Sequence, residues 1–223
     1  MINRKKILII GANSDLAKAA IKILKNNFEI IKLGSKELDL SKTFEANKLK
    51  LNFEHLIFFS AINQKKKFIK YSNAEIENHY KINFLNLSLF IKKILPVFIK
   101  KKGVNKIVLI SSLYSLFGRS ERLPYSISKF ALNGLGKNLA VEYGKYGILT
   151  NLVIPGFVDT KLTKKNINPT HLNKIKSKTP INTLVTKKQV AEVINFLISD
   201  KSNGINGQTI VVDGGLSSNG DFS

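Results

Sequence analysis

The chain is 223 residues long, contains no cysteine, and has an apolar fraction of 43% and a charged fraction of 23%. This composition is typical of one globular domain, which we assign to residues 1–223, and it excludes disulfide bonds and thiolate metal sites. The first apolar run ends at Gly11 and lysines interrupt the later ones, so no stretch is expected to act as a signal peptide or a membrane span. We therefore expect a cytoplasmic protein without a membrane partner.

The formal net charge of +21 has two interpretations. A strongly basic surface can bind nucleic acid or an acidic membrane. Alternatively, a biased base composition can enrich Lys, Asn and Ile together along the whole chain. The lysines are scattered rather than gathered in one tail or stripe, and the sequence has no aromatic-stacking or groove-reading motif. The second interpretation is favoured, and no nucleic-acid partner is expected.

Short β-branched runs alternate with longer helical patterns along the chain. In the first half, the predicted elements are a strand at Lys6–Ile10, a helix with Ala17, Ala20, Ile21 and Leu24 on its apolar face, strands at Glu29–Leu33 and His55–Phe59, and a helix at about Ser72–Lys101 that Pro96 kinks or breaks. In the second half they are a strand at Lys106–Ile110, a helix at about Pro124–Tyr143, a strand at Ile148–Ile154, a helix at Lys187–Ile198 and a strand at Gln208–Val212. The alternation predicts a single doubly wound, Rossmann-like parallel sheet with helices on both faces.

Ligands of such sheets bind beyond the carboxyl ends of the strands. The segments that follow four of the predicted strands are Gly11–Asp15, Ser60–Asn63, Ser111–Tyr114 and Pro155–Thr160. We expect these four segments to converge in space and to form the binding site.

The first of these loops, Gly11–Ala17, joins a strand to a helix. A tight turn there aims the free N–H groups and the positive dipole end of the helix at a phosphate. Gly11 permits the turn, and Asn13 and Ser14 can donate hydrogen bonds to phosphate oxygens. Because the full glycine fingerprint is absent, an ordinary helix cap by Asn13, Ser14 or Asp15 explains the loop equally well.

Tyr125 and Lys129 share one face of the predicted helix because they are four residues apart. An ammonium about 4 Å from a phenolate supplies on the order of 4 kcal/mol at an effective dielectric constant near 20, which corresponds to roughly three pKa units. A tyrosine whose pKa is lowered in this way can act as a general acid and base. The spacing alone is weak evidence, since six tyrosines and 36 Lys+Arg give about one such pair by chance.

Two further polar residues strengthen the pair. Ser112 follows the predicted strand Lys106–Ile110, thirteen residues before Tyr125, and its hydroxyl can bond a substrate oxygen. Asn83 lies on the preceding long helix and could hold a water that links the lysine to solvent.

At this point the sequence resembles the short-chain dehydrogenase/reductase family over nearly its whole length. The matching segments are Val108–Ser112, Tyr125–Lys129, Asn151–Thr160, Phe196–Asp200 and Asn206–Gly215. The resemblance implies an oxidoreductase that transfers a hydride between NAD(P) and a carbonyl or alcohol substrate. It implies a catalytic set of Asn83, Ser112, Tyr125 and Lys129, in which Tyr125 is the general acid and base. It also implies cofactor contacts at Gly11, Asn13, Ser14, Asp15, Leu16, Ser35, Asp39, Leu40, Ser60, Ala61, Tyr125, Lys129, Pro155, Gly156, Val158 and Thr160.

The sequence departs from the family pattern at three places. Asp15 and Ala17 stand where the family usually has glycines, and Ile10 where it usually has threonine. Ile62 replaces the glycine of the family's Asn-Asn-Ala-Gly segment, which is expected to put a bulky side chain near the adenosine side of the site. Only residues 35–38 separate the second strand from Asp39, so the helix usually found there is expected to be missing.

The cofactor and the substrate class are only partly defined by the sequence. Ser35 and Lys36 follow the second strand where an acidic residue would favour NAD, so NADP(H) is favoured over NAD(H), although Glu37 lies beside them. The segment between Thr160 and Ala191, which resembles a substrate lid, has eight lysines and no acid, which favours an anionic substrate. A sugar or surface-polysaccharide reductase and a 3-oxoacyl-carrier reductase both remain open, with a slight preference against the acyl reductase.

A second class of function is a catalytically weak, nucleotide-binding regulatory homologue, which the departures at Asp15 and Ile62 favour. The resemblance further implies a homodimer or homotetramer. The three histidines, His55, His79 and His171, show no metal-ligand spacing, so no metal site is expected. His79 is expected to lie on a helix surface or in packing, and Arg119, Glu121 and Arg122 either line the substrate pocket or form a solvated loop.

Overall fold

The computed structural model describes residues 4–42, 52–160, 163–164 and 167–219. Its centre is a parallel sheet of six strands in the order β2-β1-β3-β4-β5-β6. The strands are β1 (Lys6–Ile10), β2 (Glu29–Leu33), β3 (His55–Phe58), β4 (Asn105–Ile110), β5 (Ile148–Pro155) and β6 (Thr209–Val212). The predicted Rossmann-like sheet is confirmed, and every predicted strand is present with its ends shifted by at most one residue.

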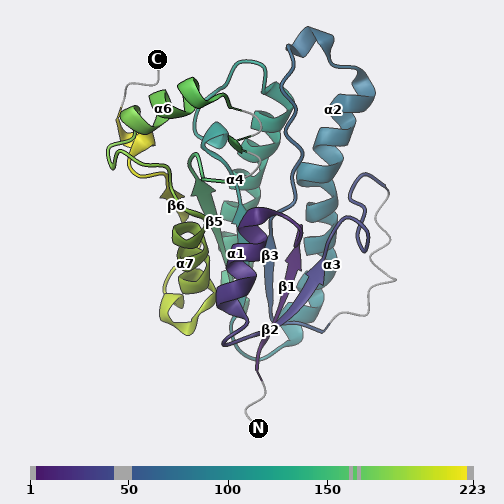
Figure 1. Cartoon of the computed structure of the whole chain (residues 1–223). Coiled ribbons are helices and arrows are strands. Elements are labelled where there is room, and N and C mark those ends of the chain that lie inside the picture. Colours follow the sequence, from purple (N-terminus) through teal and green to yellow (C-terminus); the bar gives the residue numbers. More distant parts are fainter. Residues whose placement is uncertain (1–3, 43–51, 161–162, 165–166, 220–223) are drawn as a thin grey trace.

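Helices cover both faces of this sheet (Figure 1). The α-helices among the described residues are α1 (Asp15–Leu24), α2 (Asn73–Tyr80), α3 (Asn86–Lys100), α4 (Leu123–Tyr143), α6 (Pro169–Lys178) and α7 (Lys187–Ile198). One face packs against α1 and α7, through small residues such as Ala17 and Ala20 on α1 and Ala191 on α7. The other face packs against α3 and α4.

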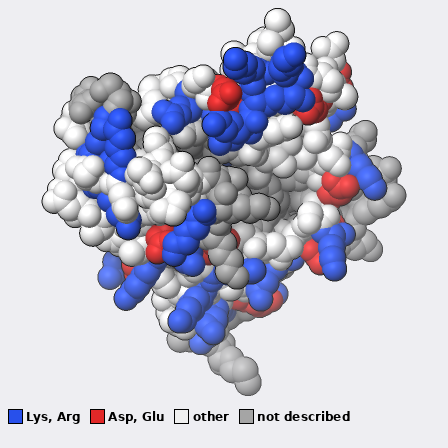
Figure 2. Space-filling view, turned by 45° about the horizontal axis from the view of Figure 1, so that its top comes forward, with Lys and Arg blue, Asp and Glu red and all other residues white. Residues whose placement is uncertain are grey.

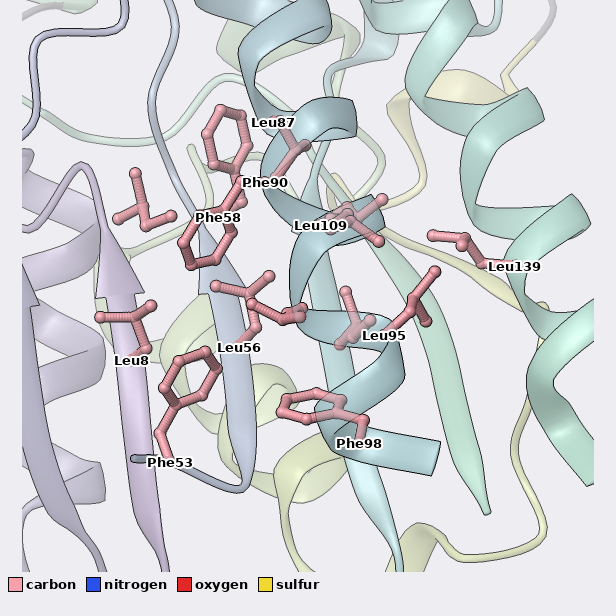
Figure 3. Packing of buried hydrophobic residues seen from close by; sticks show 14 of the residues in the cluster. Leu8, Phe53, Leu56, Phe58, Leu87, Phe90, Leu95, Phe98, Leu109 and Leu139 are labelled. Atoms are coloured by element: carbon pink, nitrogen blue, oxygen red, sulfur yellow. The ribbon is translucent and has the colours of Figure 1, made fainter. Parts of the chain in front are cut away.

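The core on the α3 side is rich in phenylalanine and leucine (Figure 3). Phe58 on β3 and Phe90 on α3 are almost fully buried, and Phe53 stacks near Phe90 with ring centroids 6.4 Å apart. Strand β4 has all six of its residues buried, which explains its continuous apolar sequence, since a central parallel strand is covered on both faces.

The long predicted helix is formed by three consecutive parts. A π-helical turn, Lys81–Leu85, joins α2 to α3. Helix α3 continues through Pro96, so of the predicted kink or break the break is wrong, and the kink stays a prediction. Pro96 lies on the exposed side of α3, where the carbonyl of Lys92, which loses its hydrogen-bond donor, can turn toward water.

Helical residues Asn73–Lys100 are also long and apolar enough to cross a membrane by length and composition. The expectation that no stretch reaches a spanning length is therefore wrong by that criterion. In the structure, however, Phe90, Ile91 and Phe98 of this stretch are buried against the sheet, as in a core helix of a folded domain.

The connection from β2 to β3 was predicted to lack its usual helix. Residues 34–42 and 52–54 contain turns and extended segments and no helix, while residues 43–51 lie outside the described residues. Leu38 and Leu40 are buried in the core below α3, and Asn86 on that helix donates a hydrogen bond to the Leu40 carbonyl over 2.7 Å. This anchoring keeps the connection on the α3 side of the sheet.

Candidate active site

A cavity of about 1030 Å³ opens at the carboxyl ends of the strands. Its lining includes residues from all four segments that were expected to converge, so that prediction is confirmed. These residues are Ser14, Asp15, Ala61, Asn63, Ser111, Ser112, Leu113, Tyr114, Pro155, Gly156, Phe157, Val158 and Thr160. The strand order reverses direction between β1 and β3, and a crevice forms beside such a switch point.

The loop after β1 makes a tight turn at Gly11, whose φ is +80°. A Cβ at this position would lie 2.6 Å from the Ser60 backbone nitrogen, so the turn needs glycine both for its conformation and for the close approach of the next loop. Ser14 is the N-cap of α1, and its hydroxyl accepts a hydrogen bond from the Ala17 backbone nitrogen over 3.2 Å. The capping interpretation is therefore correct for Ser14, and α1 still points its N-terminus, with Asp15 and Leu16, into the cavity wall.

Tyr125 and Lys129 lie in the first turns of α4 and both line the cavity. Tyr125 is 9% exposed and Lys129 is 2% exposed. The Lys129 ammonium donates a hydrogen bond to the Ile110 carbonyl at the end of β4 over 2.9 Å, and it lies 5.7 Å from the centroid of the Tyr125 ring. Tyr114 packs edge-on against Tyr125, with centroids 6.2 Å apart. The predicted pair is thus brought together on one helix face.

The electrostatics of the pair differ from the expectation. Burial raises the pKa of Tyr125, while a hydrogen bond from the Ser112 hydroxyl opposes this rise. Burial also lowers the pKa of Lys129 to about 7. The predicted lowering of the Tyr125 pKa by roughly three units is therefore wrong for this arrangement. The Lys129 ammonium bonds the Ile110 carbonyl instead of the phenol, and burial favours the neutral amine, which cannot stabilise a phenolate. The arrangement keeps Tyr125 protonated at neutral pH.

Ser112 follows β4 and begins a short 3₁₀ turn, Leu113–Ser115. Its hydroxyl oxygen accepts a hydrogen bond from the Tyr114 backbone nitrogen over 3.3 Å, and the residue is half-buried in the cavity wall. Because the hydroxyl also reaches Tyr125, a substrate oxygen near the phenol can be bonded by both groups.

Asn83 lies in the π-helical turn and is fully buried. Its Oδ1 accepts a hydrogen bond from the Ile62 nitrogen over 2.8 Å, and its Nδ2 donates to the Ile62 carbonyl and to the Ser128 hydroxyl, each over 3.0 Å. Ser128 in turn donates to the Tyr125 carbonyl over 2.7 Å. Asn83 therefore fixes the loop after β3 to the helix turn that carries Tyr125. Its expected role in holding a relay water stays a prediction.

The segment after β5 forms the opposite wall. A Cβ on Gly156 would lie 2.6 Å from the Cβ of Asp213, so this glycine lets the strand end pack against the segment after β6. Val158 pairs with Val185 in an isolated parallel bridge. Thr160 is buried, and its hydroxyl lies 2.9 Å from that of Thr163. These contacts hold Pro155 and Gly156 beside the catalytic pair.

Some expected cofactor residues lie outside the cavity wall. Asp39 points its carboxylate at Ser41, which donates from its backbone nitrogen and its hydroxyl over 2.9 and 2.6 Å, and Leu40 is buried in the core. Phe59 and Ala61 line the cavity and Ile62 does not, so the expected bulky side chain at position 62 is not part of the cavity wall. The cavity-lining set also lacks Gly11, Asn13, Ser35 and Ser60. The cofactor contacts assigned to these residues stay predictions.

The structure adds residues that the sequence did not single out. Tyr114 and Phe157 belong to two of the expected segments but had no role assigned, and both line the cavity; Ser128 connects Asn83 to Tyr125. Ser128 occupies the position just before Lys129, and that adjacency was its only signal in the sequence. Arg119, Glu121 and Arg122 line the cavity, while Arg119 is also exposed, so their contact with substrate stays a prediction; His171 on α6 lines the cavity as well.

His79 and the other titratable residues of α2 do not enter the cavity. His79 is 2% exposed, and its ring packs edge-on against Tyr71 with centroids 5.6 Å apart. This confirms the packing interpretation for His79. Within the described part of the chain, no group of three or more His, Asp or Glu is arranged to hold a metal ion.

The cavity residues fit a nicotinamide dinucleotide. Ser14, Asp15 and Leu16 place the N-terminus of α1 in the cavity wall, and a helix N-terminus of this kind binds phosphate. The same cavity is lined by Ala61, Tyr125, Lys129 and Pro155, and its volume of about 1030 Å³ is at the upper end of the range of small-molecule sites.

Comparison with known proteins agrees with this geometry. A protein-family model described as Enoyl-(Acyl carrier protein) reductase matches residues 35–217. The chain is 36% identical over 219 residues to the 3-oxoacyl-(acyl-carrier-protein) reductase FabG of Buchnera aphidicola subsp. Schizaphis graminum, which covers 96% of this chain and 89% of that protein. The chain belongs to the short-chain dehydrogenase/reductase family. It is an NAD(P)-dependent oxidoreductase, as the sequence motifs indicated.

Other members of the family give the same picture. The FabG of Rickettsia felis is 31% identical over 216 residues, with 94% of this chain and 86% of that protein covered. Among solved structures, a 4-hydroxyisoleucine dehydrogenase complexed with NADH superposes with a TM-score of 0.90 at 28% identity, covering 96% of this chain and 99% of that one. The fold is therefore that of a short-chain dehydrogenase/reductase.

Proposed function

We propose that this enzyme reduces the 3-oxo group of an acyl thioester carried on an acyl carrier protein, with NADPH as the hydride donor. The observation that carries the proposal is the buried Tyr125, protonated at neutral pH and placed beside Ser112 in the cavity wall. The FabG relatives supply the substrate class. They favour the acyl reductase over a sugar or surface-polysaccharide reductase, against the slight preference drawn from the sequence.

The raised pKa of Tyr125 favours reduction as the working direction. Reduction needs a proton donor at the carbonyl oxygen, and the oxygen that forms is a much stronger base than a phenolate. Tyr125 would donate its proton to that oxygen while the Ser112 hydroxyl bonds it and fixes its position. The hydride that the carbonyl carbon accepts would come from the nicotinamide when the cofactor is bound.

Lys129 has two tasks in this scheme. Burial lowers the pKa of its ammonium to about 7, so Lys129 can exchange a proton near neutral pH and would return a proton toward Tyr125 after each turnover. Its second task would be to hold the cofactor ribose; its ammonium contacts the Ile110 carbonyl over 2.9 Å and lies 5.7 Å from the centroid of the Tyr125 ring. Asn83 acts as a positioning residue, since its contacts with Ile62 and Ser128 fix the turn that carries Tyr125.

NADP(H) is preferred to NAD(H) in this proposal because of the residues that follow β2. Glu37, the nearest acid, accepts a hydrogen bond from the Gly34 nitrogen over 2.8 Å, so its carboxylate is turned back toward the strand end. Ser35 and Lys36 are exposed and would be free to bind the 2′-phosphate of NADP(H). We further expect the enzyme to act in the cytoplasm as a homodimer or homotetramer.

The test is the NADPH-dependent reduction of an acetoacetyl group carried on acyl carrier protein, followed by the loss of NADPH absorbance. The Tyr125→Phe variant should lose roughly 10²- to 10⁴-fold in kcat, the usual contribution of a general acid, and still bind NADPH. Tyr146→Phe, at an exposed tyrosine beyond the end of α4, is the matched control and should keep wild-type activity.

Two results would contradict the proposal. NADPH binding without reduction of any 3-oxoacyl thioester would favour the catalytically weak regulatory homologue. A higher kcat/KM with NADH than with NADPH would overturn the cofactor preference.

A further inference from the structure

A basic and partly apolar segment, Lys65–Lys70, lies beside the mouth of the cavity. Four of its six residues are lysines, and the other two, Phe68 and Ile69, are 51% and 87% exposed. They lie in a short 3₁₀ turn, Phe68–Lys70, ahead of α2. Ile69 is the most exposed large apolar side chain among the described residues, and Phe68 is next to it in the sequence.

The segment is held in a defined conformation. The Tyr71 hydroxyl donates to the Gln64 carbonyl over 2.7 Å, and the Lys66 ammonium lies 5.4 Å from the centroid of the Tyr71 ring. Lys66 also pairs with Glu75 in the first turn of α2 over 2.7 Å. The lysines and the two apolar side chains are therefore presented by a fixed scaffold, which lowers the entropy lost when a partner binds.

The loop before α4 is fastened to this segment. The backbone N–H of Lys66 donates to the Glu121 carbonyl over 3.0 Å, and Arg122 Nη1 donates to Asn63 Oδ1 over 3.2 Å. Glu121 has a φ of 62°, an uncommon conformation for a residue with a side chain, and its carboxylate pairs with Lys65 over 3.3 Å. Two segments distant in the sequence thus form one surface, which we call the basic rim: Lys65, Lys66, Lys67, Lys70, Arg119 and Arg122.

The charge of the basic rim is only partly neutralised. Glu121 pairs with Lys65 and Glu75 pairs with Lys66. Within the described part of the chain, no carboxylate pairs with Lys67, Lys70 or Arg119. The rim therefore keeps a net positive charge beside exposed apolar side chains.

The basic rim adjoins the catalytic cavity directly. Lys65, Arg119 and Arg122 line the same cavity as Tyr125. Figure 2 shows the corresponding end of the molecule, where Lys and Arg side chains gather above a hollow and outnumber Asp and Glu. A partner bound to the rim could pass an attached chain into the cavity without leaving the surface.

We infer that the basic rim, together with Phe68 and Ile69, is the docking surface for the acidic carrier protein that delivers the acyl thioester. This inference rests on the proposed function. Acidic side chains of the carrier would meet Lys67, Lys70 and Arg119, and an apolar contact would cover Phe68 and Ile69. An anionic membrane would also attract these groups, but it carries no attached substrate that would enter the cavity lined by Lys65, Arg119 and Arg122.

The experiment compares the same acetoacetyl group on acyl carrier protein and on the small, uncharged N-acetylcysteamine. The test variant is Lys67→Glu with Lys70→Glu, since neither residue lines the cavity or pairs with a carboxylate among the described residues. The control is Lys22→Glu with Lys188→Glu, two exposed lysines on α1 and α7, which lowers the net charge of +21 by the same amount. The control matters because so basic a protein attracts any anion.

The test variant should raise KM for the carrier-linked substrate at least tenfold with little change in kcat. Its kcat/KM for the N-acetylcysteamine thioester should stay within about twofold of the wild type, and the control should follow the wild type on both substrates. Ile69→Ser should weaken the carrier-linked reaction in the same selective way, through the lost apolar contact.

Three outcomes would overturn the inference. Equal losses in test and control variants would assign the effect to net charge alone. An unchanged KM for the carrier-linked substrate would place the docking surface elsewhere. Binding of the wild type to anionic phospholipid vesicles that the test variant loses, with unchanged carrier kinetics, would assign the rim to a membrane. If the wild type reduced neither thioester, the proposed function would be contradicted instead. The affinity of the wild type and the test variant for the carrier protein, measured by direct titration, would then still test the basic rim.

Discussion

Buried titratable side chains are the residues where this chain departs most from ordinary solution behaviour. His55, on β3, is 1% exposed, and burial is the largest cause that lowers its pKa to about 4 from 6.5. Lys106, on β4, is 2% exposed, and burial lowers its pKa to about 8. Its ammonium donates to the Ser202 hydroxyl and to the Ser199 carbonyl at the end of α7, a position that favours a cation. Both residues lie at the opposite end of the sheet from the active site.

His55 should make the fold sensitive to mild acid. Because its folded pKa of about 4 lies below the unfolded value, the unfolded state binds more protons between pH 6.5 and 4, so stability falls as the pH falls through this window. The full effect is about 3 kcal/mol. The free energy of unfolding of His55→Gln, measured by urea denaturation across that window, should fall less steeply than that of the wild type. If the free energies of unfolding of His55→Gln and the wild type changed with pH in parallel, the folded state would not hold His55 in its neutral form.

At the scale of elements, the contact between α4 and β5 sets the position of the catalytic helix. Gly136 permits this contact, because a Cβ there would lie 2.4 Å from Leu152 Cδ1 on β5. Gly134, on the same helix, has nothing within 4 Å of an added Cβ. The two glycines therefore differ in purpose although they are two residues apart.

Alanine at these two positions should have opposite effects. Gly136→Ala should destabilise the fold by about 1–3 kcal/mol, because Leu152 must move in a packed core. It should also lower kcat, since α4 carries Tyr125 and Lys129. Gly134→Ala should stabilise by up to about 1 kcal/mol through helix propensity. Thermal unfolding and kcat measurements on both variants test these predictions. Equal changes in stability for Gly136→Ala and Gly134→Ala would refute the close packing of α4 on β5.

The excess of cations acts at the scale of the whole molecule. The chain has 36 Lys+Arg against 15 Asp+Glu, so most basic side chains lack an acidic partner and repel one another. Salt screens such repulsion over about 10 Å at 0.1 M ionic strength. We therefore expect the folded state to become more stable as salt is added.

Raising NaCl from about 10 mM to 150 mM should stabilise the protein by about 1 kcal/mol, or roughly 2–4 °C in Tm. The Lys22→Glu with Lys188→Glu variant should have a higher Tm at low salt and a weaker salt dependence. If Tm fell with added salt, the surface ion pairs would outweigh the repulsion.

The sequence by itself determined the strands and most of the helices. Runs such as Lys6–Ile10 and Lys106–Ile110 are apolar because both faces of a central parallel strand are covered, and this pattern is local and readable. It also determined the Tyr125–Lys129 pair, since their spacing places them on one helix face wherever that helix lies. The family motifs then assigned the chemistry.

Only the tertiary structure decided how these groups interact. The Lys129 ammonium bonds the Ile110 carbonyl, and burial sets the pKa of both Lys129 and Tyr125. Desolvation depends on everything packed around a side chain, so no spacing in the sequence can report it. The basic rim likewise joins residues 65–70 to residues 119–122, which only the packing of two loops at the cavity mouth brings together.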